Sequence, residues 1–142
     1  MRATIGIALI AALAAAPAIA DDRVFSERSA SVLTENYVGS PLWSLLASCA
    51  GAEGAAHAYY AQGSKTVEAE QSKVTGVRYL NLATARLVAD RGPERQAALE
   101  MVAPVVELGR DTGLSALAYP GGHKSSQWLA IRTSCEEIAA GA

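Results

Sequence analysis

The stretch Ser40–Gly63, SPLWSLLASCAGAEGAAHAYYAQG, decides the fold because it combines a helix start, an apolar face and one of only two cysteines. Ser40 is a favourable N-cap residue, and Pro41 suits the first helical position, where its missing N–H costs nothing. The apolar residues that follow recur at helical spacing, and Cys49 falls among them. This pattern predicts a long helix from Pro41 to about Gln62, with Cys49 on its core side.

Small residues interrupt this predicted helix. Gly51 and Gly54 stand in its interior, where each glycine costs about 1 kcal/mol relative to alanine. Together with the neighbouring alanines they make a thin surface. We interpret this surface as a place of close packing against another helix, or as an open groove for a ligand.

A second helix is predicted to begin at Ser64 or Thr66 and to end at Arg91, before the helix-stopping Gly92. Its apolar residues recur mostly at spacings of three and four, whereas its charged residues lie mostly on other faces. We therefore expect these apolar side chains to face the core: Val67, Val74, Val77, Leu80, Ala83, Leu87 and Val88.

A third helix is expected to start with Pro93 as its first helical residue and Glu94 in its first turn, near the positive end of the helix dipole. Pro104 lies inside the apolar pattern that follows. Because an internal proline removes a backbone hydrogen bond and clashes with the preceding turn, we expect a kink or a break there. Gly109 and Gly113 are expected to close the segment.

The last helix follows the turn sequence Tyr119–Gly122 and is expected to run from Ser125 or Ser126 to about Ala140. Its apolar residues are spaced at three, four and three, so they define one narrow face. That face consists of Trp128, Ile131, Cys135 and Ile138. The second cysteine is therefore expected on the core side, as Cys49 is.

Residues Met1–Ala20 have the features of a secretory signal peptide. Arg2 provides a positive start, an apolar stretch follows, and Ala18–Ala20 has the A-x-A form of a cleavage site before Asp21. An uncleaved membrane anchor is the alternative, but the apolar run is short for a span, which needs about 20 residues. We expect a cleaved signal peptide and a secreted or periplasmic protein without a membrane span.

The two cysteines are expected to form a disulfide between Cys49 and Cys135, since an exported chain meets an oxidising compartment. Closing a loop of this length stabilises a chain by roughly 4 to 5 kcal/mol. Free thiols or an intermolecular bridge are the alternatives. In an up-down bundle the first and last helices are antiparallel neighbours, and both cysteines would then lie near one end. The sequence therefore predicts an all-α, up-down bundle of about four helices.

Composition limits the domain organisation and the partners. Removal of 20 residues from 142 leaves 122, enough for one domain. We expect a flexible segment over 21–39, with a short helical piece near Ser31–Tyr37, and a single helical domain over 40–142. The full chain has a net charge of −2, which becomes −3 without Arg2. Scattered basic residues give no support for binding to nucleic acid or to an anionic membrane surface.

His57 and Glu53 are candidate ligands for a metal ion because a spacing of four places them on one helix face. They make at most half of a metal site. The alternative is a partly exposed histidine that is hydrogen-bonded to its neighbour. His123 would complete a site if its loop folded back onto the first helix, and no resident cofactor is expected.

The segment Gly121–Ser126 is the best local candidate for binding an anion or a carboxylate. Its glycines lead into a helix start and bring His123, Lys124 and Ser125 together. The spacing is not that of a P-loop. An ordinary capped helix start with a solvated lysine is the alternative.

The sequence contains no evident catalytic constellation. No nucleophile elbow accompanies His123, and the adjacent pair Glu136 and Glu137 points in different directions on a helix. Aromatic residues of the first and last helices could line a pocket or simply belong to the core. These are Trp43, Tyr59, Tyr60 and Trp128.

The function expected from these features is non-enzymatic. The chain is interpreted as an exported helical binding module, an accessory, inhibitor or chaperone-like protein, whose partner is another envelope or secreted protein. A small-ligand or metal-ion binding protein that uses His57, Glu53 and the His123 loop is the alternative. Partner identity and oligomeric state do not follow from the sequence.

Overall fold

The computed structural model describes residues 40–142. The predicted signal peptide, its cleavage site and the segment 21–39 lie outside the described residues. Four α-helices and a short 3₁₀ helix make up the described part, which contains no strand. They are α2 (Leu42–Gln62), α3 (Thr66–Arg91), α4 (Arg95–Leu117), η2 (Gly122–Lys124) and α5 (Ser126–Ala140). The prediction of an all-α bundle of about four helices is confirmed.

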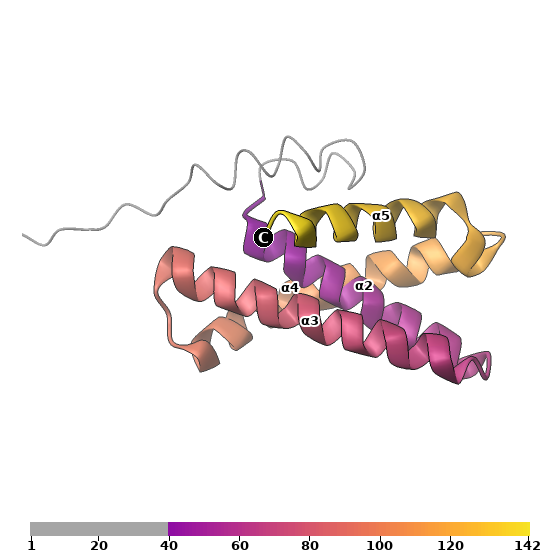
Figure 1. Ribbon diagram of the computed structural model, residues 1–142, viewed down its shortest axis with the longest axis horizontal. Coiled ribbons are helices and arrows are strands. Elements are labelled where there is room, and N and C mark those ends of the chain that lie inside the picture. Colours follow the sequence, from indigo (N-terminus) through magenta and orange to yellow (C-terminus); the bar gives the residue numbers. More distant parts are fainter. Residues whose placement is uncertain (1–39) are drawn as a thin grey trace, which may run out of the picture.

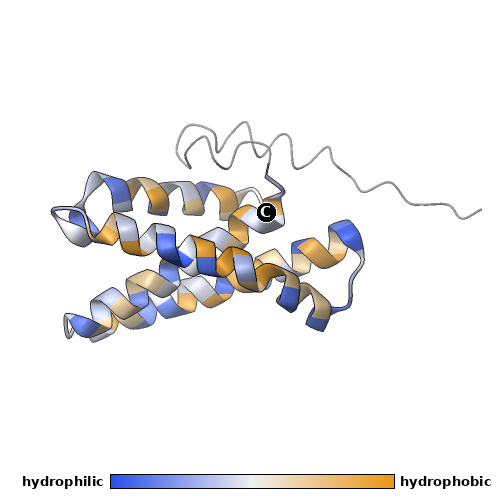
Figure 2. Cartoon of the chain, turned by 180° about the vertical axis from the view of Figure 1, so that it is seen from behind, coloured by the Kyte–Doolittle hydropathy of each residue, from blue (hydrophilic) through white to orange (hydrophobic). Residues whose placement is uncertain are grey.

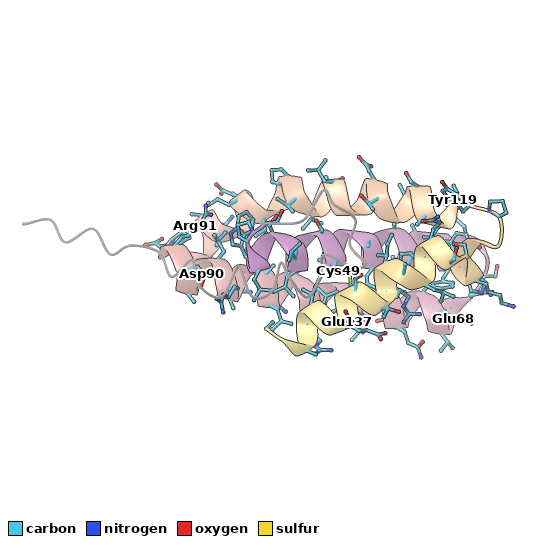
Figure 3. The ribbon with its side chains drawn as sticks, turned by 90° about the horizontal axis from the view of Figure 1, so that it is seen from above. Cys49, Glu68, Asp90, Arg91, Tyr119 and Glu137 are labelled. Atoms are coloured by element: carbon cyan, nitrogen blue, oxygen red, sulfur yellow. A yellow bond between two sulfur atoms is a disulfide. The ribbon has the colours of Figure 1, made fainter. Side chains whose placement is uncertain are left out.

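The helices run alternately in opposite directions, and α5 ends beside the start of α2 (Figure 1). Helix α2 contacts each of the other three helices. Figure 3 shows α2 between α3 and α4, with α5 crossing over it. Fourteen of the 21 residues of α2 are buried, so this helix is the centre of the bundle rather than one of four equal members.

A disulfide joins Cys49 of α2 to Cys135 of α5, with their Cα atoms 5.6 Å apart. Both cysteines are almost completely buried. Figure 3 labels Cys49 at the place where α5 crosses α2. The predicted pairing is confirmed, and the alternatives of free thiols or an intermolecular bridge are wrong. A disulfide of this kind is typical of an oxidising, extracellular environment.

The hydrophobic core extends along α2 in two clusters. One surrounds the disulfide and includes Leu45 and Leu46, which are completely buried. The other lies toward the opposite end of α2 and includes Tyr60, Leu117 and Trp128. Ile131 packs against both clusters, so α5 covers the join between them.

Helices α2 and α4 touch through their backbones. A Cβ atom added to Gly51 would meet the carbonyl oxygen of Val106, and would lie 2.6 Å from the backbone nitrogen of Arg110. A Cβ atom on Gly109 would meet the carbonyl oxygen of Ser48. No side chain fits between the two helices at these points. The close-packing interpretation of the small-residue surface is therefore correct at Gly51.

Gly109 and Gly113 do not close the third helix, contrary to expectation. Both lie inside α4 and are buried. A Cβ atom on Gly113 would lie 2.9 Å from the Cα atom of Ala52. These glycines, four residues apart on one helix face, permit close approach of α4 to α2 instead of ending the helix.

Helix α4 also continues through Pro104, so the expected break does not occur. Pro104 is exposed, whereas Val102 before it and Gly109 after it are buried. Tertiary contacts on both sides of the proline hold the helix together despite the lost backbone hydrogen bond.

Two predicted helix starts differ by one or two residues from those observed. Pro41, not Ser40, is the N-cap of α2, and its carbonyl oxygen accepts from the N–H of Ser44 at 2.9 Å. Glu94 is the N-cap of α4, so Pro93 precedes the helix. The start of α3 at Thr66, directly after the N-cap residue Lys65, is one of the two expected starts and is confirmed. The predicted helix ends agree better with the observed ones. Helix α3 ends at Arg91 as expected, and Gly92 adopts the left-handed conformation, φ 73°, that stops it.

The expected core face of α3 is wrong in its first half. Val67, Val74 and Val77 are 66%, 61% and 52% exposed. The residues that face α2 there are small, namely Ala69, Ser72 and Gly76. Because small residues let α3 approach α2 closely, the larger valines turn outward. Figure 2 shows apolar and polar residues interspersed along the surface helices.

We expect removal of the disulfide to destabilise the bundle strongly. The double variant Cys49→Ala/Cys135→Ala should lose about 4 kcal/mol of unfolding free energy, since the crosslink spans 86 residues. Urea unfolding followed by circular dichroism measures the loss. A loss below about 1 kcal/mol would mean that packing alone fixes α5 to α2.

Two glycine substitutions test the close contact between α2 and α4. Gly109→Ala should destabilise the protein by about 2 to 3 kcal/mol, because the new methyl group meets the backbone of Ser48. Gly54→Ala is the matched control: no atom lies within 4 Å of the added Cβ, and helix propensity should stabilise this variant by about 1 kcal/mol. In thermal unfolding, Gly109→Ala should melt at a lower temperature than the wild type, and Gly54→Ala at a higher one. Equal effects would contradict the backbone contact.

Candidate functional site

Glu53 is a buried carboxylate at the centre of the bundle. Its side chain is 4% exposed, and its Oε1 lies 3.7 Å from Nε of Arg132 on α5. Ser72 on α3 forms a side-chain hydrogen bond with it. Glu53 stands four residues after Cys49, and Arg132 three residues before Cys135, so this ion pair is adjacent to the disulfide. The carboxylate therefore connects three helices.

Burial raises the pKa of Glu53 because removal from water disfavours the charged carboxylate. Arg132 and the hydrogen bond from Ser72 act in the opposite direction, whereas the charge of Glu136 raises the pKa further. The net direction is upward. Glu53 is thus a group that gains a proton more readily in the folded protein than in the unfolded chain.

His57 does not share a site with Glu53. Its Nδ1 lies 2.9 Å from the carbonyl oxygen of Ala69 on α3, and it donates a hydrogen bond there. Glu53 instead turns to Arg132 and Ser72. The two residues predicted to act together therefore have different partners. Within residues 40–142, no group of three or more His, Cys, Asp or Glu side chains is placed to hold a metal ion.

The loop that carries His123 folds back onto the end of α2. Its ring lies against Tyr60 and Tyr59, with centroids 5.5 and 5.9 Å away. Its Nε2 lies 3.4 Å from Nζ of Lys65, at the start of α3. Desolvation lowers the pKa of His123, and the nearby charges of Lys65 and Lys124 lower it further. The neutral form of His123 is therefore favoured, and its Nε2 accepts a hydrogen bond from the ammonium group of Lys65.

Figure 3 shows the connection that contains Tyr119 at the same end of the bundle as Glu68, near the start of α3. Lys124 and Ser125, two of the residues predicted to bind an anion, differ in their exposure to solvent. Lys124 is exposed. Ser125 is buried: its hydroxyl accepts from the N–H of Trp128 at 3.2 Å and donates to the carbonyl oxygen of Ala116. Ser125 is therefore the N-cap of α5.

The four aromatic residues of the first and last helices mainly belong to the core. Trp43, Tyr60 and Trp128 are buried, and Tyr59 packs against the cluster that contains Tyr60 and Trp128. Arg91 lies over the ring of Trp43, 5.6 Å from its centroid. These residues contribute packing and a cation–π contact rather than an aromatic binding pocket.

A small pocket, which we call the Gly54 pocket, lies where α2, α3 and α4 meet. It has a volume of about 210 Å³. Gly54 and His57 of α2, Lys73 and Val77 of α3, and Val106 of α4 contribute to its lining. Its surface is mostly apolar. His57 is the only predicted site residue in this lining.

The outer surface of α3 is the second unusual feature. Val67 and Val74, seven residues apart, lie on one side of the helix, in a shallow depression that also includes Glu70 and Gln71. Val77 follows and reaches the Gly54 pocket. We call the exposed set Val67, Val74 and Val77 the α3 valine stripe. An apolar stripe in contact with water is more informative about function than a buried one.

Sequence reasoning missed several of these residues. Arg132, Ser72 and Lys65 come from elements remote from their partners, so no local pattern could associate them. Gly76 did offer a signal, since an interior helical glycine requires a packing reason. A Cβ atom there would lie 3.3 Å from Cβ of Glu53.

No helix within residues 40–142 combines the length and the apolar character that crossing a membrane requires.

The raised pKa of Glu53 predicts an unusual pH dependence. The folded protein takes up this proton at a higher pH than the unfolded chain does, so protonation should stabilise the fold as the pH falls from neutrality toward 4.5. The unfolding free energy of the wild type, measured relative to Glu53→Gln, should therefore rise over this interval. Urea unfolding at several pH values provides the measurement.

Glu68→Gln is the control for this experiment because Glu68 is an exposed carboxylate of α3. A fall in the relative stability of the wild type, instead of a rise, would contradict the assignment. A matching trend in Glu68→Gln would assign the effect to carboxylates in general.

Comparisons of the chain with protein-family models, with curated proteins and with solved structures give no match.

Proposed function

We propose that this protein is an exported, non-enzymatic helical module that binds another protein of the cell envelope or secreted fraction through the outer surface of α3. The observation that supports the proposal most directly is the α3 valine stripe. Each of its three valines is more than half exposed, although the opposite side of the same helix is packed against α2.

The spacing of the stripe fits a helical partner. Val67, Val74 and Val77 are separated by seven and three residues, the spacing by which one helix presents apolar residues to another. Burying such a face against an apolar face of a partner gains roughly 25 cal/mol per Å² of apolar surface. An amphipathic helix is thus the kind of partner that the stripe suits.

Charged residues beside the stripe can determine the orientation of the partner. Glu70 and Lys73 lie on the same outer side, with their charged atoms 3.7 Å apart and their side chains well exposed. An exposed pair of this kind contributes little to stability. Both groups are free to form charged contacts with a partner, which would favour specificity more than affinity.

Export is supported by two features. Residues Met1–Ala20 have the pattern of a cleaved signal peptide. The disulfide between Cys49 and Cys135 suits an oxidising compartment. Together these two features favour a periplasmic or secreted location for the processed chain.

A binding role rather than catalysis is favoured because several potentially reactive side chains are engaged in structural contacts. Both cysteines are in the disulfide, Ser125 caps α5, and Glu53 pairs with Arg132. Each of these groups therefore has a structural partner.

The proposal is tested by capturing partners from the protein's own envelope and secreted fractions. Tagged wild type and the double variant Val67→Lys/Val74→Lys are used as baits, and captured proteins are quantified by mass spectrometry. We expect a defined protein with the wild type, and a loss of about tenfold or more with the variant, as for removal of an interface hot spot.

Leu129→Lys is the matched control, because Leu129 is 50% exposed on α5 and remote from the stripe in sequence. This variant should capture the same protein as the wild type. Equal capture by wild type and by Val67→Lys/Val74→Lys would show that the stripe is not the interface.

A further inference from the structure

We propose that the Gly54 pocket is an anchor site that receives one branched apolar side chain from the helical partner, together with a carboxylate that pairs with Lys73. The proposal rests on the proposed function, because the α3 valine stripe would form the rest of the interface. It adds a specific site, the class of residue that fills it and a test that needs no identified partner.

Gly54 has no structural reason to be a glycine. It is exposed although its neighbours Glu53 and Ala55 in α2 are buried, and a Cβ atom added to it would meet no atom within 4 Å. Its backbone is also not in the positive-φ region. By contrast, Gly51 and Gly109 are needed where two backbones touch. A glycine at position 54 weakens the helix, and its effect on the surface is to keep this pocket open.

The size of the pocket suits a single side chain. Its volume of about 210 Å³ is smaller than the range of roughly 300 to 1,000 Å³ that is usual for small-molecule sites. Its apolar wall includes Val77, Leu80 and Val106. An apolar residue that fills a pocket of this kind at the centre of an interface is the usual anchor of protein binding.

The pocket and the valine stripe are continuous. Val77 belongs to the pocket lining and to the exposed stripe. A helix lying along the stripe would therefore pass the pocket, and one of its side chains could enter while its neighbours contact Val74 and Val67. The pocket alone is too small to define a partner, but it fixes the register of a helix on the stripe.

The charge at the pocket favours an acidic group beside the anchor. Lys73 is part of the lining, and its side chain is 58% exposed. Its contact with Glu70 is long, at 3.7 Å, and solvated. His57 is the other titratable residue of the lining, and its Nδ1 is already used as a donor to Ala69. A carboxylate of the partner would therefore pair with Lys73.

The test uses 4-methylpentanoate, which combines the branched end of a leucine side chain with a carboxylate. It is titrated into the ¹⁵N-labelled protein, and amide shifts are recorded by NMR. We expect saturable shifts at Gly54, Val77 and Leu80. Gly54→Leu, which fills the pocket with its own side chain, should raise the apparent Kd by roughly tenfold or more, and Lys73→Gln should raise it less.

Two controls separate the possible results. Gly54→Ala adds only a methyl group and shows whether the fold tolerates a side chain here, with circular dichroism as the check. 4-Methylpentan-1-ol lacks the carboxylate, and its binding should not respond to Lys73→Gln. Shifts that are absent, scattered over the surface, or unchanged in Gly54→Leu would overturn the proposal.

The same variants distinguish this proposal from the proposed function. Gly54→Leu is added to the capture experiment beside Val67→Lys/Val74→Lys. Loss of the partner with the valine variant alone would support the stripe and overturn the anchor site. Probe binding in the pocket without any stripe-dependent partner would overturn the proposed function and the anchor role together, leaving the pocket as a small-ligand site.

Discussion

The close approach of α2 and α4 is the constraint on which the rest of this structure depends. Gly51 on one helix and Gly109 on the other leave room for the backbones to touch, and any side chain at either point would separate them. The gain is van der Waals contact between main chains, and the cost is the low helix propensity of glycine. Because small residues also face α3, α2 can be enclosed by three helices instead of lying at a corner of a square bundle.

This central position explains the two links to α5. Helix α5 has only 15 residues, the fewest of the four α-helices within residues 40–142. The disulfide fixes it covalently to α2. One turn along, the Glu53–Arg132 pair makes a second link, in which a buried charge is balanced by a half-exposed guanidinium and a hydroxyl from α3. An isolated buried carboxylate would be costly, so this pair favours one position of α5.

The same packing determines which surface is available for binding. With small residues on the inner side of the first half of α3, the α3 valine stripe remains in contact with water. Gly54, beside the contact between α2 and α3, leaves a pocket instead of adding a side chain. The proposed interface is thus a consequence of how closely the helices approach, and its apolar character has no role in the core of the bundle.

Much of the fold could be predicted from local patterns. Helix number and type, the stop at Gly92 and the start of the last helix at Ser125 or Ser126 follow from short-range chemistry. The pairing of the cysteines follows because two cysteines allow only one intramolecular disulfide. The candidate site was predicted less well. His57, Glu53 and His123 were recognised as notable residues, but their partners are far apart in sequence: Ala69, Arg132 and Lys65.

The sequence by itself determined the helices and the covalent link, because capping, periodicity and thiol pairing act over a few residues or through one unique pair. Only the tertiary structure decided that α2 is central, that α4 continues through Pro104 and that the α3 valine stripe faces outward. The physical reason is that helical periodicity identifies the faces of a helix but does not determine which face packs against the core. In the first half of α3, the face with small residues packs more closely against α2 than the valine face would, so the small-residue face is buried.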